Sequence, residues 1–239
     1  MNTSTNSPSN TTTNPGPSAR DKSGSSTKSD RFTSTPTDLH TFLRTRRSIR
    51  RFKADPSTGS GQRPVPDSVI ERILTTATYA PSAHNLQPWR FAIAAPASAG
   101  RERLAHALTS AMRRDMTAEG APAAEIESRV ARSLKRLNEA PVIIVLCRDV
   151  TAVREHKRED EIMSIQSVAN AATYLLLAAH AEGLGGNWIC WTLYAQEETR
   201  QALGLPETWE PQAMVFIGYA DEEPKEKVVK PLNEIVEQV

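Results

Sequence analysis

The chain has 239 residues, a length typical of one ordinary domain with enough sequence to bury a sizeable core. Its 29 Lys and Arg residues nearly balance its 28 Asp and Glu residues, and the formal net charge of +1 excludes the strong basic bias of a dedicated nucleic-acid binder. No apolar run near the N-terminus is long enough for a signal peptide or a membrane span, so we expect a cytoplasmic protein without a membrane partner.

The first part of the chain, residues 1–37, is rich in Ser, Thr, Asn, Pro and Gly and poor in apolar side chains. Such a composition cannot offset the conformational entropy that folding would remove. We therefore expect a disordered low-complexity tail over residues 1–37 and one folded domain over residues 38–239. A tail that lies upstream of the true start is an equal alternative, and neither reading gives the tail a chemical role.

The first half of the folded part predicts four helices and two strands. A short helix from Asp38 leads into a basic stretch, and apolar residues at helical spacing predict a helix that begins at Pro66 and ends before Pro81. Residues 89–94 predict a strand. The same helical spacing predicts helices around residues 104–112 and 126–137, and the unbroken apolar run 142–147 indicates a central strand covered on both faces.

The second half predicts the longest helix, from about residue 160 to 182, ended by Gly183 and Gly185. Strands are predicted at 187–192 and 212–219, with a short helix at 197–203 between them. This order of elements predicts an α+β fold with a central mixed sheet covered by helices. The sequence contains no glycine-rich dinucleotide or P-loop motif.

A basic motif, Arg46-Arg47-Ser48-Ile49-Arg50-Arg51-Phe52, follows the first predicted helix. Guanidinium groups bind phosphate oxygens through paired hydrogen bonds, and a serine hydroxyl adds another donor. The motif therefore fits a phosphorylated cofactor. Taken alone, a solvated basic face is the more frequent explanation of such a run.

A second motif changes that balance. It reads Ala80-Pro81-Ser82-Ala83-His84-Asn85-Leu86-Gln87-Pro88-Trp89-Arg90-Phe91. Together the two motifs resemble the paired signature of the nitroreductase family, and the likeness continues through residues 182–189, 217–219 and 227–232. The resemblance covers essentially everything after residue 37. It implies a nitroreductase-like α+β fold, an intertwined homodimer with one FMN in each interface, and an FMN-dependent oxidoreductase.

The resemblance also implies which residues hold the flavin. Arg46–Ser48 would meet its phosphate and ribityl side, while Arg50 would face the pyrimidine edge of the ring, where a fixed cation favours the reduced form. Pro81–Ala83 would contact the cofactor largely through their backbone. Asn85 would reach the ring from the partner subunit, and Gln87 would support this loop.

Further cofactor contacts are implied near the C-terminus. Ile189 and Cys190 match the strand end where the family places backbone donors against the N5 and O4 edge of the flavin. Lys227 and Lys230 occupy late basic positions that complete the phosphate site, and which of the two meets the phosphate is open. The expected cofactor-binding residues are thus Arg46, Arg47, Ser48, Ile49, Arg50, Pro81, Ser82, Ala83, Asn85, Gln87, Ile189, Cys190, Lys227 and Lys230.

No side chain is expected to be catalytic by itself, because the chemistry takes place at flavin N5, and no metal site is expected. Cys190 is more often a small buried hydrophobe than a redox thiol at such a position. The side chains of Trp188, Trp191 and Trp209 could cover the flavin ring, but tryptophans at these spacings are more often core residues.

A closer resemblance lies within the family. Residues 114–126, 139–141 and 209–222 resemble the FMN-binding C-terminal domain of the bifunctional enzyme that completes coenzyme F-420. This implies that reduced FMN transfers hydride to the dehydro precursor of F-420, with Met116 near the substrate and Arg113, Arg114 and Arg132 supplying positive charge. The N-terminal extension is too short and too polar for that enzyme's glutamate ligase, so only the reductase half carries over.

Two other functions stay in view. A general NAD(P)H-dependent nitro or quinone reductase fits the motifs equally well, because they specify the cofactor and leave the oxidant open. A non-catalytic flavin-binding protein, or a polybasic module that binds nucleic acid or lipid through residues 44–53, is the alternative of another class. The co-occurrence of the two motifs argues against that module. The electron donor is open, with NAD(P)H as the expected class.

Overall fold

The computed structural model describes Met1 and residues 34–239, so most of the expected tail, residues 2–33, lies outside the described residues. The chain divides into two compact units, Met1–Thr41 and Phe42–Val239. Helix α1 (Pro36–Thr45) begins with a reciprocal cap, in which Thr35 N donates to Asp38 Oδ2 at 2.9 Å and Asp38 N donates to Thr35 Oγ1 at 3.2 Å. The hydrogen bonds from Thr35 also lower the pKa of Asp38.

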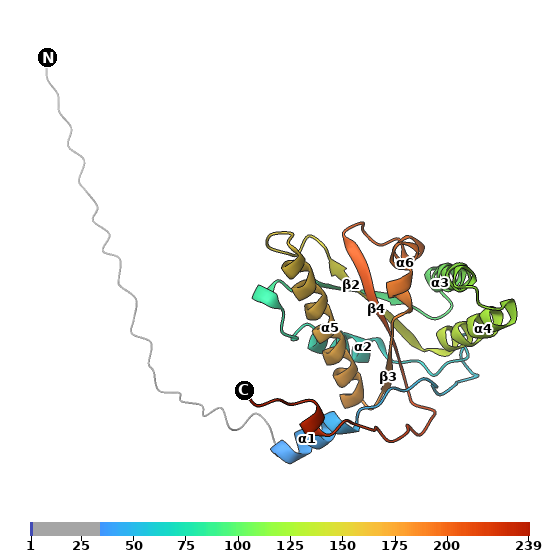
Figure 1. Ribbon diagram of the computed structural model, residues 1–239, viewed down its shortest axis with the longest axis horizontal. Helices are drawn as coiled ribbons and strands as arrows, with labels where there is room; N and C mark the ends of the chain where they lie inside the picture. Colours follow the sequence, from blue (N-terminus) through green and yellow to red (C-terminus); the bar gives the residue numbers. More distant parts are fainter. Residues whose placement is uncertain (2–33) are drawn as a thin grey trace. The chain divides into compact units, whose positions relative to one another are not determined.

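A four-stranded sheet forms the centre of the second unit, with the strands in the order β1 (Trp89–Ala94), β2 (Val142–Asp149), β4 (Trp209–Gly218) and β3 (Gly185–Ile189) (Figure 1). Every residue of β2 is buried, which confirms the predicted central strand. The expected mixed sheet needs correction, because all neighbouring strands pair antiparallel. Parallel pairing is limited to an isolated bridge between Ser48 and Gly186.

The two faces of β2 belong to two separate cores. Val142, Ile144 and Leu146 pack under α2 (Asp67–Ala77) and α5 (Arg158–Ala181), whereas Ile143, Val145 and Cys147 pack under the helices of the other face. Those helices are α3 (Ala99–Ala118), α4 (Ala123–Glu139) and α6 (Gln196–Leu203). The alternation is that of a pleated strand covered on both sides. All five helices were predicted, four of them (α2, α3, α4 and α5) from their apolar spacing.

Strand β3 begins earlier than predicted and ends earlier, because residues 191–194 form a 3-10 turn, η3 (Trp191–Tyr194). Gly183, with φ of +73°, ends α5, and Leu184 N donates to Ala179 O at 2.9 Å. Gly185, in contrast, lies inside the strand. A Cβ atom there would stand 2.6 Å from Cβ of Ile49, so this position needs glycine for close packing.

Strand β4 begins at Trp209, three residues before the predicted start. The stretch from Trp209 to Pro211, which was not predicted as strand, is therefore part of the sheet. Glu210 lies opposite Arg148 of β2, and Pro211 pairs beside a register shift between Leu146 and Cys147. A shift of this kind accommodates a proline within a sheet.

Helix α5 has two different faces. Its buried face includes Val168, Ala172 and Leu175, while Ile162 and Tyr174 are exposed on the other side. Among the described residues α5 is the one helix that is long and apolar enough to cross a membrane, a weak signal that the core helix of a soluble protein also gives. An exposed apolar helix face favours contact with another protein surface.

Candidate functional site

Two cavities lie at opposite ends of strand β3. The first, here called the Arg46 cavity, has a volume of about 270 Å³ and includes residues 183–186 at the start of the strand. The second, the α4 cavity, has a volume of about 550 Å³ and includes residues 189–191 at its end. Five residues of strand span about 13 Å at ~3.3 Å per residue. A molecule with an anionic group at one end and a flat ring at the other could lie along this strand.

The basic motif is fixed to the sheet beside the first cavity. Ile49 N donates to Gly186 O at 3.0 Å, and the bridge between Ser48 and Gly186 aligns the preceding residues with the strand. Arg47 donates to the carbonyl of Arg46 at 2.9 Å and so braces the turn. The guanidinium of Arg46 lines the cavity and forms no hydrogen bond or ion pair with the described residues. It is free to bind an anion.

His180 lies next to Arg46 in the same cavity. Its ring stacks on Phe42, with ring centroids 4.9 Å apart, and its Nε2 lies 3.1 Å from Thr45 Oγ1. Burial of the ring, and then the charge of Arg46, lower the pKa of His180. The imidazole is therefore neutral at pH 7, and the positive charge in this cavity comes from the arginines.

Glu222 is the carboxylate that lines the Arg46 cavity. It accepts from the backbone N–H groups of Arg50 and Arg51, the latter at 3.1 Å, and its Oε2 lies 3.5 Å from Nε of Arg51. Burial alone would raise the pKa of Glu222, but these N–H groups and the Arg51 guanidinium lower it overall. Arg51 is thus engaged by a carboxylate, whereas the Arg50 guanidinium has no ion pair among the described residues.

The second motif forms a loop that lies on α5. Ala83 N donates to Ser167 Oγ at 3.2 Å, and Asn170 Nδ2 donates to Pro81 O at 3.2 Å. Gln87 braces the loop from within, because its N donates to Ser82 Oγ at 3.1 Å and its Nε2 donates to Asn85 Oδ1 at 3.3 Å.

The same loop carries backbone strain. His84, Asn85 and Gln87 have φ values of 51°, 56° and 49°, in the left-handed region that L-residues seldom adopt. Strain of this kind persists only where the surrounding structure imposes it, and it clusters at ligand-binding segments. The strain makes the loop a candidate functional element on a ground that does not depend on its sequence motif.

The two motifs lie beside different stretches of α5. The loop contacts the helix at Ser167 and Asn170, whereas the Arg46 cavity includes Leu176 and His180 nearer its C-terminal end. At ~1.5 Å per residue, the separation along the helix axis is about 9 Å between Asn170 and Leu176 and about 20 Å between Ser167 and His180.

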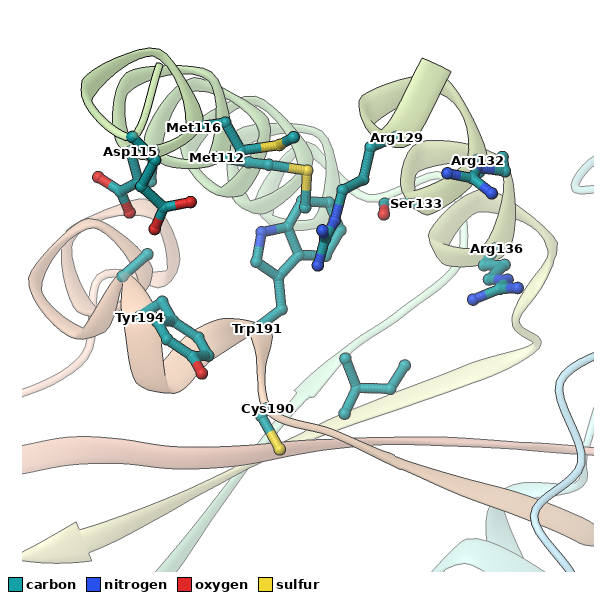
Figure 2. Close-up of a pocket in the computed structure, with 14 residues that line it drawn as sticks. Met112, Asp115, Met116, Arg129, Arg132, Ser133, Arg136, Cys190, Trp191 and Tyr194 are labelled. Atoms are coloured by element: carbon teal, nitrogen blue, oxygen red, sulfur yellow. The ribbon is translucent and has the colours of Figure 1, made fainter. Parts of the chain in front are cut away.

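The α4 cavity lies between α3, α4 and the end of β3 (Figure 2). Ile189, Cys190 and Met116, all expected site residues, line it. Cys190 is exposed, so the expectation of a buried hydrophobe at this position is wrong. The other cysteine, Cys147, is fully buried, and burial raises its pKa to about 12, which makes it an inert thiol.

The positive charge of this cavity comes from α4. Arg129, Arg132 and Arg136 line it together with Ser133, and sequence reasoning had singled out Arg132 alone. Their spacing of three and four residues, which places them on one helix face, was the signal that could have found the other two. Arg113 and Arg114, expected to add charge here, are engaged elsewhere: Arg113 pairs with Glu127 at 2.7 Å, and Arg114 with Glu198 at 2.6 Å.

A buried arginine anchors α4. Arg101 of α3 is 4% exposed and donates to the carbonyls of Leu137 and Ala140 at the C-terminal end of α4. Burial lowers the pKa of Arg101 to about 10, still well above neutrality. A cation at a helix C-terminus also interacts favourably with the helix dipole. These contacts hold the arginine face of α4 in place.

The remaining expected residues lie nearer the surface. Lys227 and Lys230 are exposed in the C-terminal segment 224–239 and do not line the Arg46 cavity, although Pro224 does. Trp191 and Trp209 pack against the core, as predicted, but Trp188 is 36% exposed. The indole of Trp191 donates to Leu108 O at 3.1 Å, which fixes its ring at the edge of the α4 cavity.

Comparisons with known proteins agree with this geometry. The sequence profile of the nitroreductase family matches residues 43–219. A Bacillus subtilis protein named "Putative NAD(P)H nitroreductase YfhC" is 30% identical over 201 residues, or 82% of this chain and 91% of that protein. An NADH dehydrogenase of Thermus thermophilus is 29% identical over 228 residues, or 83% and 95%. A Desulfovibrio desulfuricans protein solved in complex with FMN matches with a TM-score of 0.65 and 24% identity, over 87% of this chain and 98% of that one.

Proposed function

We propose, from the premise that this chain belongs to the nitroreductase family and is an FMN-dependent oxidoreductase, that it oxidises NAD(P)H and reduces a planar organic oxidant. The observation that carries the proposal is strand β3, with an arginine-lined cavity at one end and a larger open cavity at the other. In the overall reaction NAD(P)H loses a hydride, and the oxidant gains that hydride and a proton from solvent.

The residues along β3 fit FMN. We assign the phosphate to Arg46, Arg47 and Ser48, because the Arg46 guanidinium lines the cavity and has no partner among the described residues. The ring is assigned to the other end of the strand, at Ile189 and Cys190. When bound there, FMN supplies hydride transfer, for which the chain itself has no group.

We further propose that the chain works as a homodimer. The supporting observation is that the two motif sites lie beside different stretches of α5, about 9 to 20 Å apart along its axis, which an antiparallel second copy of α5 would bring side by side. The exposed apolar residues also call for a partner: Ile162 and Tyr174 on α5, and Val228, Leu232 and Ile235 in the C-terminal segment. In such a dimer Lys227 and Lys230 stay our candidates for completing the phosphate site.

Arg50 is proposed to tune the flavin, since its guanidinium has no carboxylate partner among the described residues. Arg50→Ala is expected to lower the flavin's midpoint potential by tens of millivolts. The physical reason is that a charge-assisted contact of about 1.5 to 3 kcal/mol would be lost from the anionic reduced form, and 30 mV corresponds to about 1.4 kcal/mol for two electrons. Anaerobic reductive titration of the bound flavin measures this shift. An unchanged potential with full FMN occupancy would place Arg50 away from the ring.

The remaining question is which oxidant the enzyme reduces. The dehydro precursor of coenzyme F-420 is our first candidate, supported by Met116 and Arg132 at the α4 cavity. Arg113 and Arg114 were also expected to attract this precursor, but both pair with carboxylates, so they no longer support it as the oxidant. A general nitro or quinone reductase is equally consistent with the site.

A panel of oxidants separates these two candidates. The protein, reduced anaerobically, is mixed with the dehydro precursor, a quinone or a nitroaromatic, and flavin reoxidation is followed by absorbance. For an F-420 enzyme we expect the precursor to reoxidise the flavin at least tenfold faster than the quinone. Fast reoxidation by the quinone with none by the precursor would leave the general reductase, and no reoxidation by any oxidant would contradict the proposed activity.

A further inference from the structure

The arginine face of α4 is unusual because its charge is not balanced. Arg129, Arg132 and Arg136 form no hydrogen bond or ion pair with a carboxylate among the described residues. Two carboxylates of α4 are engaged by other cations, Glu127 by Arg113 at 2.7 Å and Glu139 by Lys135 at 3.7 Å. Like charges at this helical spacing destabilise a helix, and an anionic ligand would reverse that effect.

The acidic groups of the cavity lie on the other helix. Asp115 and Glu119 line the α3 side, and Figure 2 shows Asp115 across the cavity from the three arginines. Asp115 is bound by Arg114, whose Nε lies 2.9 Å from its Oδ1. The α4 side is thus the side that attracts an anion, and the hydroxyl of Ser133 adds a neutral donor there.

A flat surface lies beside this anion-binding face. The Trp191 ring is held by its hydrogen bond to Leu108 O, and Met112 lines the same part of the cavity. With a volume of about 550 Å³, the cavity is large enough for a drug-sized ring system that bears a charged group.

We propose that Arg129, Arg132 and Arg136 bind a phosphate group of the enzyme's redox partner, whose planar ring lies near Trp191 and Cys190. This rests on the proposed function for the direction of electron flow. The phosphate belongs either to the donor, as the 2′-phosphate of NADPH, or to the oxidant, as a phosphate ester. In both cases the arginine face selects redox partners that carry this phosphate over those that lack it.

Equilibrium binding tests the face without relying on turnover. NADP⁺ and NAD⁺ are titrated by calorimetry into the purified protein as isolated, at low salt. If the donor carries the phosphate, we expect NADP⁺ to bind at least tenfold more tightly than NAD⁺, and Arg129→Gln/Arg132→Gln/Arg136→Gln to abolish that difference, because tenfold is about 1.4 kcal/mol, within reach of one charge-assisted hydrogen bond. Glutamine keeps the helix propensity of these exposed positions, and circular dichroism verifies the fold.

A charge-matched control lies on the same helix. Lys135→Gln removes one positive charge from α4 at a residue that pairs with Glu139 and does not line the cavity. It is compared with the single variant Arg132→Gln, which we expect to weaken NADP⁺ binding while Lys135→Gln leaves it unchanged. Equal weakening by both would reduce the effect to long-range charge and overturn the assigned site.

The oxidant arm uses a naphthoquinone that bears a phosphate ester and its unphosphorylated parent, each titrated in the same way. Preference for the ester with no preference for NADP⁺ assigns the phosphate to the oxidant, and the reverse assigns it to the donor. If neither NADP⁺ nor the phosphate ester binds better than its counterpart without that phosphate, the proposal is wrong. Absence of turnover with an arginine-dependent preference intact would instead refute the proposed activity and leave the phosphate site standing.

Discussion

Glu210→Ala is expected to lower the free energy of unfolding by about 3 kcal/mol, because it leaves a buried guanidinium without its counter-ion. Arg148 Nε and Nη2 lie 2.7 and 3.1 Å from the two carboxylate oxygens of Glu210, across neighbouring strands at the middle of the sheet. The Arg148 side chain is 9% exposed and its Nη1 has no partner. Chemical denaturation at fixed protein concentration measures the loss.

The pH dependence of the same pair has a defined sign. The hydrogen bond from Arg148 lowers the pKa of Glu210 below 4.5, against the opposing effect of burial. A carboxyl whose pKa is lower in the folded state contributes stability above its unfolded pKa and loses it as the pH falls through the folded pKa. The difference in stability between the wild type and Glu210→Ala is therefore expected to be full at pH 7 and to shrink below about pH 4.5.

Glu127→Ala is the matched control, since it removes a carboxylate from an arginine pair of the same geometry at the surface. The side chains of Arg113 and Glu127 are 45% and 60% exposed, and solvent screens such pairs almost completely. We expect no measurable change in the midpoint of unfolding. A similar loss in both variants would show that burial does not set the strength of the Glu210 pair.

The sequence predicted elements well where packing imposes a single pattern. β2 is an unbroken apolar run because both of its faces are covered by helices, and the boundaries of β1 were predicted without error. Prediction failed at the start of β3, because Gly185 looks like a helix-stop signal. The role of Gly185 and of Gly186 beside it is spatial, since a Cβ on either would stand within 2.7 Å of a side-chain atom of Ile49 or Leu176.

The candidate site was predictable in its motifs and not in its charges. Helical spacing shows that Arg129, Arg132 and Arg136 share a face, but only the packing of α4 against α3 shows that this face borders a cavity. Likewise, Arg113 and Arg114 look equivalent to Arg132 in the sequence, yet carboxylates from α4 and α6 pair with them. Tertiary partners that are distant in the chain decide which charges are available to a ligand.

The shared flavin site makes a prediction with a large effect. Arg46→Glu reverses charge at the proposed phosphate site, and Asn85→Asp places a carboxylate near the reduced ring while tolerating the φ of 56°. Each variant alone is expected to retain less than about a tenth of the wild-type NAD(P)H-quinone activity, because each exceeds the loss of one charge-assisted contact. Steady-state turnover per bound flavin, and FMN content after gel filtration, measure the two defects.

Combining the two variants in one dimer tests whether a site draws on both subunits. Heterodimers of Arg46→Glu with Asn85→Asp are isolated through two different affinity tags. In a two-fold dimer with shared sites, one site collects both substitutions and the other collects neither, so roughly half of the wild-type activity should return. If Arg46 and Asn85 of the same chain met one flavin, every site would carry one defect and no activity would return. That outcome would place the loop and the basic motif of one chain at the same flavin and would contradict the shared site.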